Sequence, residues 1–387
     1  MALSVVTSLE TIEEPKRTMV AFSKIVIAGG GVIGNSVSYY LAKLNIASTI
    51  IDPIGIAPAA SGKAGGFLAR DWSDGSPIGK LQQRSFDLHA EQAEDLGAEN
   101  IDYRRLVCTA VSCDERADVV AKPSGKKLQG VELADINVLG RNIMGGPETI
   151  AQVHPKKLCD AMWKYSQDAG SKLVIGKVVE AIVNDDGSMS GVRLDDGTTI
   201  DCDALVIACG PWSDATKSWF PSEIGKTIPR MLGVKYHSIL IKSPHVLDEA
   251  VFFSGHGDPE VYPRPDGDAY ITGFPDPAIV VTESPGKEEV RPDAVNRLVD
   301  ATKKVSSLLG PIPPHTEQSC YLPTTNDGLP VIGAIPSCSG AFICSGHGCW
   351  GILNGPATGE AMAELLTGGE TNHVDIKMLG VQSPYRR

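Results

Sequence analysis

The sequence predicts a doubly wound α/β fold joined to a second, α+β region built on a mixed or antiparallel sheet. Three observations support this prediction. An apolar run at 24–29 is followed by glycines and then by apolar residues at helical spacing. Three strand-like segments occupy residues 171–209, and the first two end in Asp-Gly turns. Short alternating segments separated by Pro, Gly and Asp follow at 233–274, which is typical of a sheet with one ligand-facing or solvated side.

The remaining elements can be placed in order along the chain. Residues 24–29 are expected to form a strand, 32–46 a helix and 47–52 a second strand, which together make a β-turn-α-β opening. Amphipathic helices are expected at 79–96 and at 155–169, where Pro155 starts the helix and Gly170 ends it. After the strand regions the pattern predicts a helix at 290–309, strands at 329–334 and 341–346, and a last helix at 356–368.

Size, charge and composition exclude several classes of protein. With 387 residues, the chain is long enough for two or three domains. Its 35 Lys and Arg against 47 Asp and Glu give a net charge of −12, which disfavours nucleic acid and anionic membranes as partners. Apolar residues make up 42% of the chain and charged residues 21%, which is the usage of a globular protein rather than a disordered or fibrous one.

The cysteines and the hydropathy pattern predict a cytoplasmic location. The nine cysteines form an odd set without a C-x-x-C pair, which fits a reducing compartment better than secretion. No apolar stretch approaches 18 residues, so no membrane span is expected. Residues 1–22 are expected to be a flexible leader and have the features of neither a signal peptide nor a transit peptide. No His and Cys cluster has the spacing of a metal site.

The strongest local motif is GGGVIG at residues 29–34, a G-x-G-x-x-G between an expected strand and an expected helix. Gly29 allows the tight turn, and Gly31 lets a pyrophosphate approach the helix N-terminus. Gly34 lets the helix and the strand pack closely. The motif therefore predicts a dinucleotide site that also includes the two intervening apolar residues, Val32 and Ile33.

Asp52 completes the pattern, because it lies 21 residues after Gly31 at the end of the second strand. There its carboxylate can accept hydrogen bonds from ribose hydroxyls, which leaves NAD and FAD both open. Two more glycine turns follow expected strands, one at 209–210 and one at 346–351. A long cofactor contacted by N-terminal, middle and C-terminal segments fits FAD better than NAD in a single crevice.

Four segments carry a family resemblance: 61–67 (SGKAGGF), 206–213 (VIACGPWS), 324–333 (TTNDGLPVIG) and 345–352 (SGHGCWGI). In this order they resemble the D-amino-acid oxidase, glycine oxidase and sarcosine oxidase family of flavoproteins. The resemblance runs from about Ser23 to Gly368 and is specific for the family rather than for a substrate. It implies a Rossmann-type FAD-binding domain of discontinuous segments (23–105, 150–230 and 318–370), a substrate domain (106–149 and 231–317) and a C-terminal tail (371–387).

The same resemblance implies which residues contact FAD, and the family usually has Glu where this chain has Asp52. The flavin and the pyrophosphate are expected to meet Ser61, Ala64, Gly65 and Gly66. The adenine region is expected to meet the backbone of Val179. The adenine dinucleotide is expected to contact Ala208, Cys209, Gly210 and Trp212. The residues expected to close over the isoalloxazine and the ribityl chain are Gly346, Gly348, Gly351 and Ile352.

Cys320 lies seven residues before Asp327, a position that resembles the cysteine joined covalently to flavin in the sarcosine oxidase branch. A covalent bond needs a thiolate, and a thiolate needs positive charge or a dipole nearby. Cys320 alone does not supply such surroundings, and a free cysteine in a strand is commonly structural. Non-covalent FAD is therefore expected.

The substrate side departs from the known branches, because Leu322 stands where glycine oxidase-like members carry a carboxylate-binding arginine. Arg70, and the pair Tyr262 and Arg264, are the candidates to replace it, since arginine is the best bidentate partner of a carboxylate. They predict a small-molecule substrate with an anionic group. Each also has a structural explanation: a surface or phosphate-neighbouring charge for Arg70, and a strand-edge pair for the other two.

Two residues of the last glycine turn, His347 and Trp350, complete the candidate catalytic set. His347 is a candidate to polarise flavin or substrate, although it can equally be there for packing. Trp350 stands where the resemblance implies a lysine over the flavin in the sarcosine oxidase branch. A neutral indole cannot stabilise the negative charge that develops on oxygen.

The resemblance implies oxidation of a C–H bond next to an amine, with a hydride passing to flavin. Two alternatives stay open. One is a flavin dehydrogenase of a 2-hydroxy acid or an amine that uses an acceptor other than oxygen. The other is an interaction or trafficking protein whose FAD is structural.

Overall fold

The computed structural model describes residues 22–116 and 132–386, so the expected leader lies outside the described residues apart from Phe22. A six-stranded sheet in the order β18-β19-β12-β1-β2-β8 forms its first layer. All neighbours are parallel except β18 and β19. The strands are β1 (Ile25–Ala28), β2 (Ser48–Asp52), β8 (Lys172–Ile175), β12 (Ala204–Ile207), β18 (Val331–Ala334) and β19 (Ala341–Ser345).

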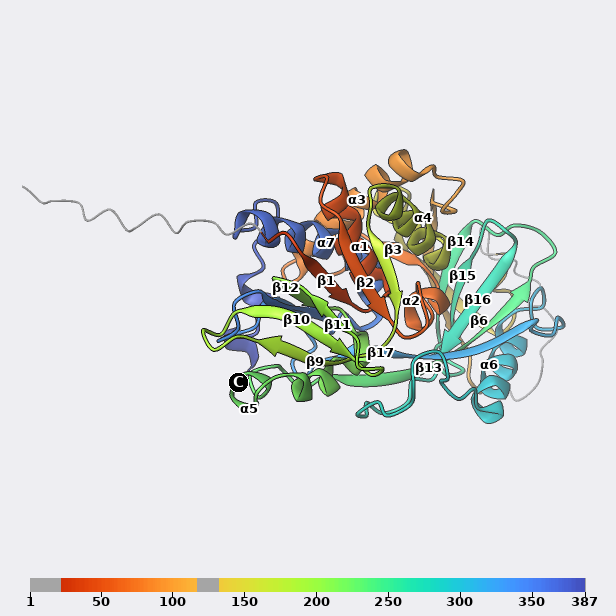
Figure 1. The fold of residues 1–387 in the computed structure, drawn as a ribbon. Coiled ribbons are helices and arrows are strands. Elements are labelled where there is room, and N and C mark those ends of the chain that lie inside the picture. The colour runs from red at the N-terminus through yellow and green to blue at the C-terminus, as the bar shows by residue number, and fades with distance from the viewer. Residues whose placement is uncertain (1–21, 117–131, 387) are drawn as a thin grey trace, which may run out of the picture.

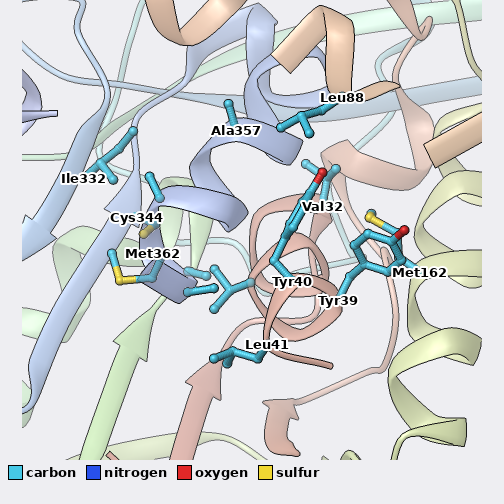
Figure 2. Close-up of a cluster of buried hydrophobic side chains, with 14 of the residues drawn as sticks. Val32, Tyr39, Tyr40, Leu41, Leu88, Met162, Ile332, Cys344, Ala357 and Met362 are labelled. Atoms are coloured by element: carbon cyan, nitrogen blue, oxygen red, sulfur yellow. The ribbon is translucent and has the colours of Figure 1, made fainter. Parts of the chain in front are cut away.

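Four helices cover one face of this sheet (Figure 1): α1 (Val32–Lys43), α3 (Gly79–Leu96), α4 (Pro155–Asp168) and α7 (Gly351–Gly368). Their apolar faces meet in one core, and Figure 2 shows side chains from each of them, namely Leu41, Leu88, Met162 and Met362. Helices α1 and α7 approach closely, because a Cβ atom at Gly359 would lie 2.5 Å from the backbone of Ser36. The expected doubly wound layer is thus present.

A small antiparallel sheet covers the opposite face of the six-stranded sheet, with strands in the order β11-β10-β9. Its strands are β9 (Val178–Val183), β10 (Met189–Leu194) and β11 (Thr199–Asp201). The three segments expected at 171–209 therefore divide further, because the first and third each break in the middle. The first half of the first segment, β8, and the second half of the third segment, β12, join the parallel sheet.

The second region is a mixed seven-stranded sheet in the order β17-β13-β16-β15-β14-β5-β6, in which only β5 and β14 are parallel neighbours. Helix α6 (Pro292–Val305) packs against one of its faces. The other face meets the first region. The strands are β5 (Val107–Cys113), β6 (Val138–Gly145), β13 (Leu232–Lys242), β14 (Glu249–Ser254), β15 (Glu260–Pro263), β16 (Asp268–Gly273) and β17 (Thr316–Thr324).

Two segments differ from the expected domain division. Residues 318–324, expected in the FAD-binding domain, belong to β17 and pair with β13, so they form an edge of the second sheet. The segment expected as a tail at 371–387 packs against the helical core through Val374, Ile376 and Leu379. Near its end, the buried Arg386 places Nη1 3.1 Å from Oδ2 of Asp327. Both segments therefore help to fix the loop at 325–330.

Shorter elements connect the two regions. A three-stranded sheet is formed by β3 (Phe67–Ala69), β7 (Ile150–Gln152) and β4 (Arg104–Arg105). Short helices are α2 (Ala60–Lys63) and α5 (Ser222–Gly225), and the 3-10 helices are η1 (Gly210–Trp219), η2 (Gly348–Trp350), η3 (Lys377–Leu379) and η4 (Pro384–Arg386). Within residues 22–116 and 132–386, no helix has the length and hydropathy to cross a membrane.

Candidate functional site

The glycine turn between β1 and α1 is fixed by two close contacts. Gly29 has a φ of +116°, and a Cβ atom on it would lie 2.3 Å from the carbonyl oxygen of Ala208. A Cβ atom on Gly34 would lie 2.0 Å from the carbonyl oxygen of Gly29. Only glycine allows strand β12, the turn and helix α1 to pack at these distances. The geometry matches the roles expected from the sequence for these two glycines.

Gly31 differs from the other two glycines because it faces open space. Its φ is −71°, which any residue adopts, and a Cβ atom on it would meet only Oγ of Ser61, at 3.2 Å. The Ser61 hydroxyl accepts a hydrogen bond of 2.9 Å from the amide of Val32. No acidic residue lies in the first turn of α1. The turn therefore forms a cradle for an anion at a helix N-terminus.

Asp52 ends β2 with a buried carboxylate that three backbone amides hold. Oδ2 accepts from Gly30 at 2.8 Å, and Oδ1 accepts from Ile54 at 2.9 Å and Gly55 at 3.0 Å. A carboxylate has about four acceptor sites, so one remains for a ribose hydroxyl. Asp52 thus has a structural role that the sequence does not reveal, and its binding to ribose stays a prediction.

A cavity of about 680 Å³ begins at the glycine turn and reaches the last glycine turn at 347–352. It joins segments from the beginning, middle and end of the chain. The expected site residues in its wall are Gly29, Gly31, Val32, Ile33, Asp52, Ser61, Ala64, Ala208, Cys209, Gly210, Trp212, His347, Gly348, Gly351 and Ile352. Leu322 also lies in the wall, at the position where the resemblance expects an arginine.

One side of the cavity is closed by residues that the sequence did not single out. The segment 281–287, between β16 and α6, lies in the wall together with 176–178. The indole of Trp212 donates a hydrogen bond of 2.7 Å to the carbonyl of Glu283. The Glu283 carboxylate in turn accepts from Lys235 at 3.2 Å and Tyr321 at 2.8 Å. The second region therefore contributes directly to the cofactor-sized cavity.

Several expected site residues lie outside the cavity wall. Gly65 and Gly66 continue the loop after Ala64, and Val178 rather than the exposed Val179 is in the wall. Gly346 has a φ of +84°, a conformation that favours glycine, at the start of the last glycine turn. These residues lie next to or close to wall residues in the chain.

The two candidate arginines are both engaged elsewhere. Arg70 forms a bidentate pair with Asp87, with distances of 3.0 and 3.1 Å, and is about one-third exposed. Arg264 is buried and donates a hydrogen bond of 3.0 Å to the carbonyl of Ala64. Burial lowers the pKa of Arg264, and its guanidinium lies over the ring of Tyr270. Arg264 thus holds the backbone of the cavity loop.

His347 and Trp350 occupy different environments. His347 is buried in the cavity wall, and Nε2 lies 3.0 Å from the hydroxyl of Thr358. Burial lowers the pKa of His347 to about 3, so the imidazole is neutral. Trp350 points into an aromatic cluster, with its ring 5.9 Å from that of Trp72, while its neighbour Cys349 lies in the wall.

Glu260 is an acidic residue that the sequence reasoning missed. It belongs to β15 and accepts a hydrogen bond from the hydroxyl of Tyr262, two residues along the same face. Burial, and to a smaller extent the negative charge of Glu260, raises the pKa of Cys349, which lies in the cavity wall. Burial raises the pKa of Glu260 itself, and the Tyr262 hydroxyl only partly offsets this. Strict alternation in β15, with Glu260 and Tyr262 on one face and Val261 on the other, is the signal that would have found it.

We expect Glu260→Gln to stabilise the protein at neutral pH. The folded state raises the pKa of Glu260 above 4.5, so its stability contribution is present below pH 4.5 and is lost as pH rises through the raised value. Glutamine stays neutral and keeps an oxygen for Tyr262. Thermal unfolding from pH 4 to 8 measures this. A higher midpoint at pH 7 that converges with the wild-type midpoint near pH 4 is expected, whereas a lower midpoint at pH 7 contradicts it.

The family model described as FAD dependent oxidoreductase (DAO) matches residues 24–365. The chain belongs to this family. A putative oxidoreductase of Schizosaccharomyces pombe is similar to it, with 31% identity over 92% of this chain and 97% of the relative. A glycine oxidase of Geobacillus kaustophilus is 27% identical over 90% of this chain and 93% of that enzyme. Membership of the DAO family makes the protein an FAD-dependent oxidoreductase and bears out the resemblance seen in the sequence.

Solved structures show that the fold is that of the DAO family. The crystal structure of glycine oxidase from Geobacillus kaustophilus has a TM-score of 0.77 at 22% identity, covering 93% of this chain and 98% of that one. L-proline dehydrogenase from P. horikoshii has a TM-score of 0.76 at 21% identity, covering 94% and 97%. The expected Rossmann-type layer with a mixed second sheet is confirmed.

The residues present fit the cofactor that the DAO family uses. A long side chain at Gly31 would enter the cradle, Asp52 keeps one acceptor site, and the cavity continues past Ala208 to His347. Among the described residues, no group of three His, Cys, Asp or Glu side chains is arranged to hold a metal ion.

We expect the flavin to be released by acid precipitation, without a covalent bond to Cys320. Burial raises the pKa of the Cys320 thiol to about 12, against a smaller lowering by Lys63. The Lys63 ammonium is itself paired with Glu288 at 2.7 Å. A neutral thiol is a poor nucleophile. The absorbance of supernatant and pellet decides the question: colour that stays with the pellet and is lost in Cys320→Ser contradicts the prediction.

Proposed function

We propose that this protein binds FAD non-covalently and oxidises a C–H bond next to an amine. The observation that supports the proposal is the continuity of the cavity from the anion cradle at Gly31 to the turn at 347–352, beside the sheet face that carries Glu260. Bound FAD supplies a hydride acceptor. The chain's own residues bind the cofactor, orient the donor and exclude water.

Each part of the site has a distinct task in this proposal. The glycine turn and Ser61 bind the pyrophosphate, and Asp52 binds a ribose hydroxyl. Arg264 holds the loop at Ala64 in place through its hydrogen bond. The neutral imidazole of His347 packs against the turn without adding charge. The aromatic side chains of the second sheet limit the access of water to the space beside Cys349.

The dehydrogenase alternative also has support from one observation, the neutrality of His347. Oxygen acquires negative charge as it accepts its first electron, and a nearby cation favours this step. His347, with a pKa of about 3, gives no such cation at neutral pH. Slow reoxidation of the reduced protein is therefore expected. Stopped-flow mixing with air-saturated buffer measures it, and reoxidation as fast as turnover contradicts this prediction.

Anaerobic reduction of the purified flavoprotein tests the proposed function. The panel contains primary and secondary amines, amino acids and 2-hydroxy acids, and the readout is bleaching of the flavin absorbance. Bleaching by amines supports the proposal. Bleaching by hydroxy acids alone favours the other dehydrogenase reaction, and no bleaching by any donor favours a structural FAD.

A further inference from the structure

One face of the seven-stranded sheet turns away from α6 and towards the cavity. The strand register places Glu260 opposite Phe252 on β14 and opposite Thr272 on β16. Tyr262 lies opposite Tyr270 on the same face. Because side chains alternate along a strand, these residues share one side of the sheet, and the other side packs on α6.

Five aromatic rings gather on this face and on the segments that meet it. Neighbouring ring centroids lie 5.2 to 5.9 Å apart in Phe67, Trp72, Phe252, Tyr262 and Trp350. Most of these contacts are tilted or edge-on. Trp72, Phe252 and Trp350 are only partly buried, so parts of their rings are accessible. Accessible ring faces attract cations.

Glu260 lies at the edge of this aromatic cluster without a cationic partner among the described residues. The groups that act on it electrostatically are Tyr262, Tyr236, Cys349 and Cys108, all neutral at pH 7. A carboxylate is costly to surround with apolar groups unless a positive charge joins it. Glu260 is nevertheless partly exposed, so a ligand can reach it.

The arginines expected to bind an anion do not act on Glu260. Leu322 lies in the cavity wall where an arginine is expected, and Arg70 is paired with Asp87. Arg264 donates to the carbonyl of Ala64 and lies over the ring of Tyr270, and the carboxylates that act on its charge are Asp266, Asp268 and Asp102 rather than Glu260. Glu260 therefore has no partner of opposite charge among the described residues.

We propose that Glu260 and the aromatic cluster bind the ammonium group and an apolar substituent of an amine substrate that carries no carboxylate. The inference rests on the proposed function and names its substrate class. It replaces the anionic group expected from Arg70, Tyr262 and Arg264. The amine nitrogen lies at Glu260, and its substituent contacts Trp72 and Phe252.

The same carboxylate prepares the amine for oxidation. An N–H bond of the ammonium breaks, the proton passes to an Oε atom of Glu260, and both charges disappear. The nitrogen keeps the electron pair of that bond. A hydride can leave the neighbouring carbon only when this lone pair is available to form the C=N bond.

Isothermal titration calorimetry on the flavin-loaded protein at pH 7.5 tests the site with three probes: benzyltrimethylammonium, benzyl alcohol and benzoate. The cation cannot be oxidised, because its nitrogen has no lone pair. We expect it to bind more tightly than the other two. Glu260→Gln is expected to weaken its binding by at least about tenfold, as for loss of one charged contact, and to leave benzyl alcohol unchanged.

Glu249→Gln is the matched control. Glu249, on β14, is also an acid of this sheet whose pKa is raised by burial. It lies on the same side of β14 as Val251, which is the side that faces α6, and it accepts a hydrogen bond from Thr109. Its variant is expected to bind the cation as the wild type does. Tighter binding of benzoate, or cation binding that Glu260→Gln leaves intact, overturns the proposal.

The test separates the inference from the function it rests on. If amines bleach the flavin but cation binding does not depend on Glu260, the proposed function stands and the proposed amine site is wrong. If cation binding depends on Glu260 but no donor bleaches the flavin, the proposed amine site stands and the proposed oxidation is wrong.

Discussion

Gly31→Glu is expected to produce a folded but colourless protein. The glutamate Cβ meets only Oγ of Ser61, at 3.2 Å, and the backbone φ of −71° suits any residue, so the fold survives. The new carboxylate points into the anion cradle. Two unit charges 4 Å apart repel by about 4 kcal/mol at an effective dielectric of 20. This corresponds to about a 1,000-fold loss of FAD affinity.

Flavin absorbance after gel filtration with added FAD measures the loss, and circular dichroism measures the fold. Gly31→Ala is expected to keep most of the flavin, since only the Ser61 hydroxyl has to move. Gly140→Glu is the matched control, because a Cβ atom there meets nothing within 4 Å. Normal flavin content in Gly31→Glu would show that the pyrophosphate does not bind at this turn.

The β-turn-α-β opening could be predicted because all its signals are local. The apolar run at β1, the glycines and the helical spacing of α1 lie within 20 residues and agree with each other. Segment 318–324 was harder to assign. Its partner β13 lies about 80 residues earlier in the chain. The local sequence pattern therefore cannot predict that these two strands pair. The breaks between β8 and β9 and between β11 and β12 were missed for a similar reason, since each half pairs with a different sheet.

The residues of the candidate site also fall into two groups, those that a local pattern identifies and those that depend on tertiary contacts. Gly29, Gly34 and Asp52 were found because a turn against a helix requires particular residues at fixed spacing. Glu260 was missed, although it lies near Cys349, because the contact depends on how two sheets meet. Arg70 was attractive as a lone arginine, but its partner Asp87 lies on the next helix. Charge pairing is a tertiary property that a residue list does not show.

The structure also links the cofactor loop to the substrate face at Gly65. A Cβ atom there would lie 2.2 Å from the Tyr262 ring, which is stacked between Phe67 and Tyr270. The glycine therefore lets the loop after Ala64 lie flat against the ring that holds Glu260. If the proposed site is correct, this contact joins the cofactor loop to the ring that donates a hydrogen bond to Glu260.

Asp52→Ala is expected to destabilise the flavin-free protein and to weaken FAD binding together. The substitution leaves the amides of Gly30, Ile54 and Gly55 without their acceptor, next to a buried turn. Hydrogen bonds to a charged group contribute about 1.5–3 kcal/mol each, and water replaces some of them. We expect a loss of about 3 kcal/mol. The loop at 53–55 forms part of the cavity wall, so its displacement also lowers FAD affinity.

Urea unfolding of the flavin-free protein and fluorescence titration with FAD measure the two effects. Asp196→Ala is the matched control, because Asp196 also accepts a backbone hydrogen bond, 2.8 Å from the Thr198 amide, but in an exposed turn. The loss of stability in this variant is expected to be much smaller than in Asp52→Ala. Asp52→Asn keeps an oxygen for Ile54 and Gly55 but turns an NH₂ group towards Gly30, so an intermediate loss is expected. If Asp52→Ala lowers FAD affinity with no change in stability, the carboxylate acts on the ribose alone and the three backbone contacts contribute nothing to folding.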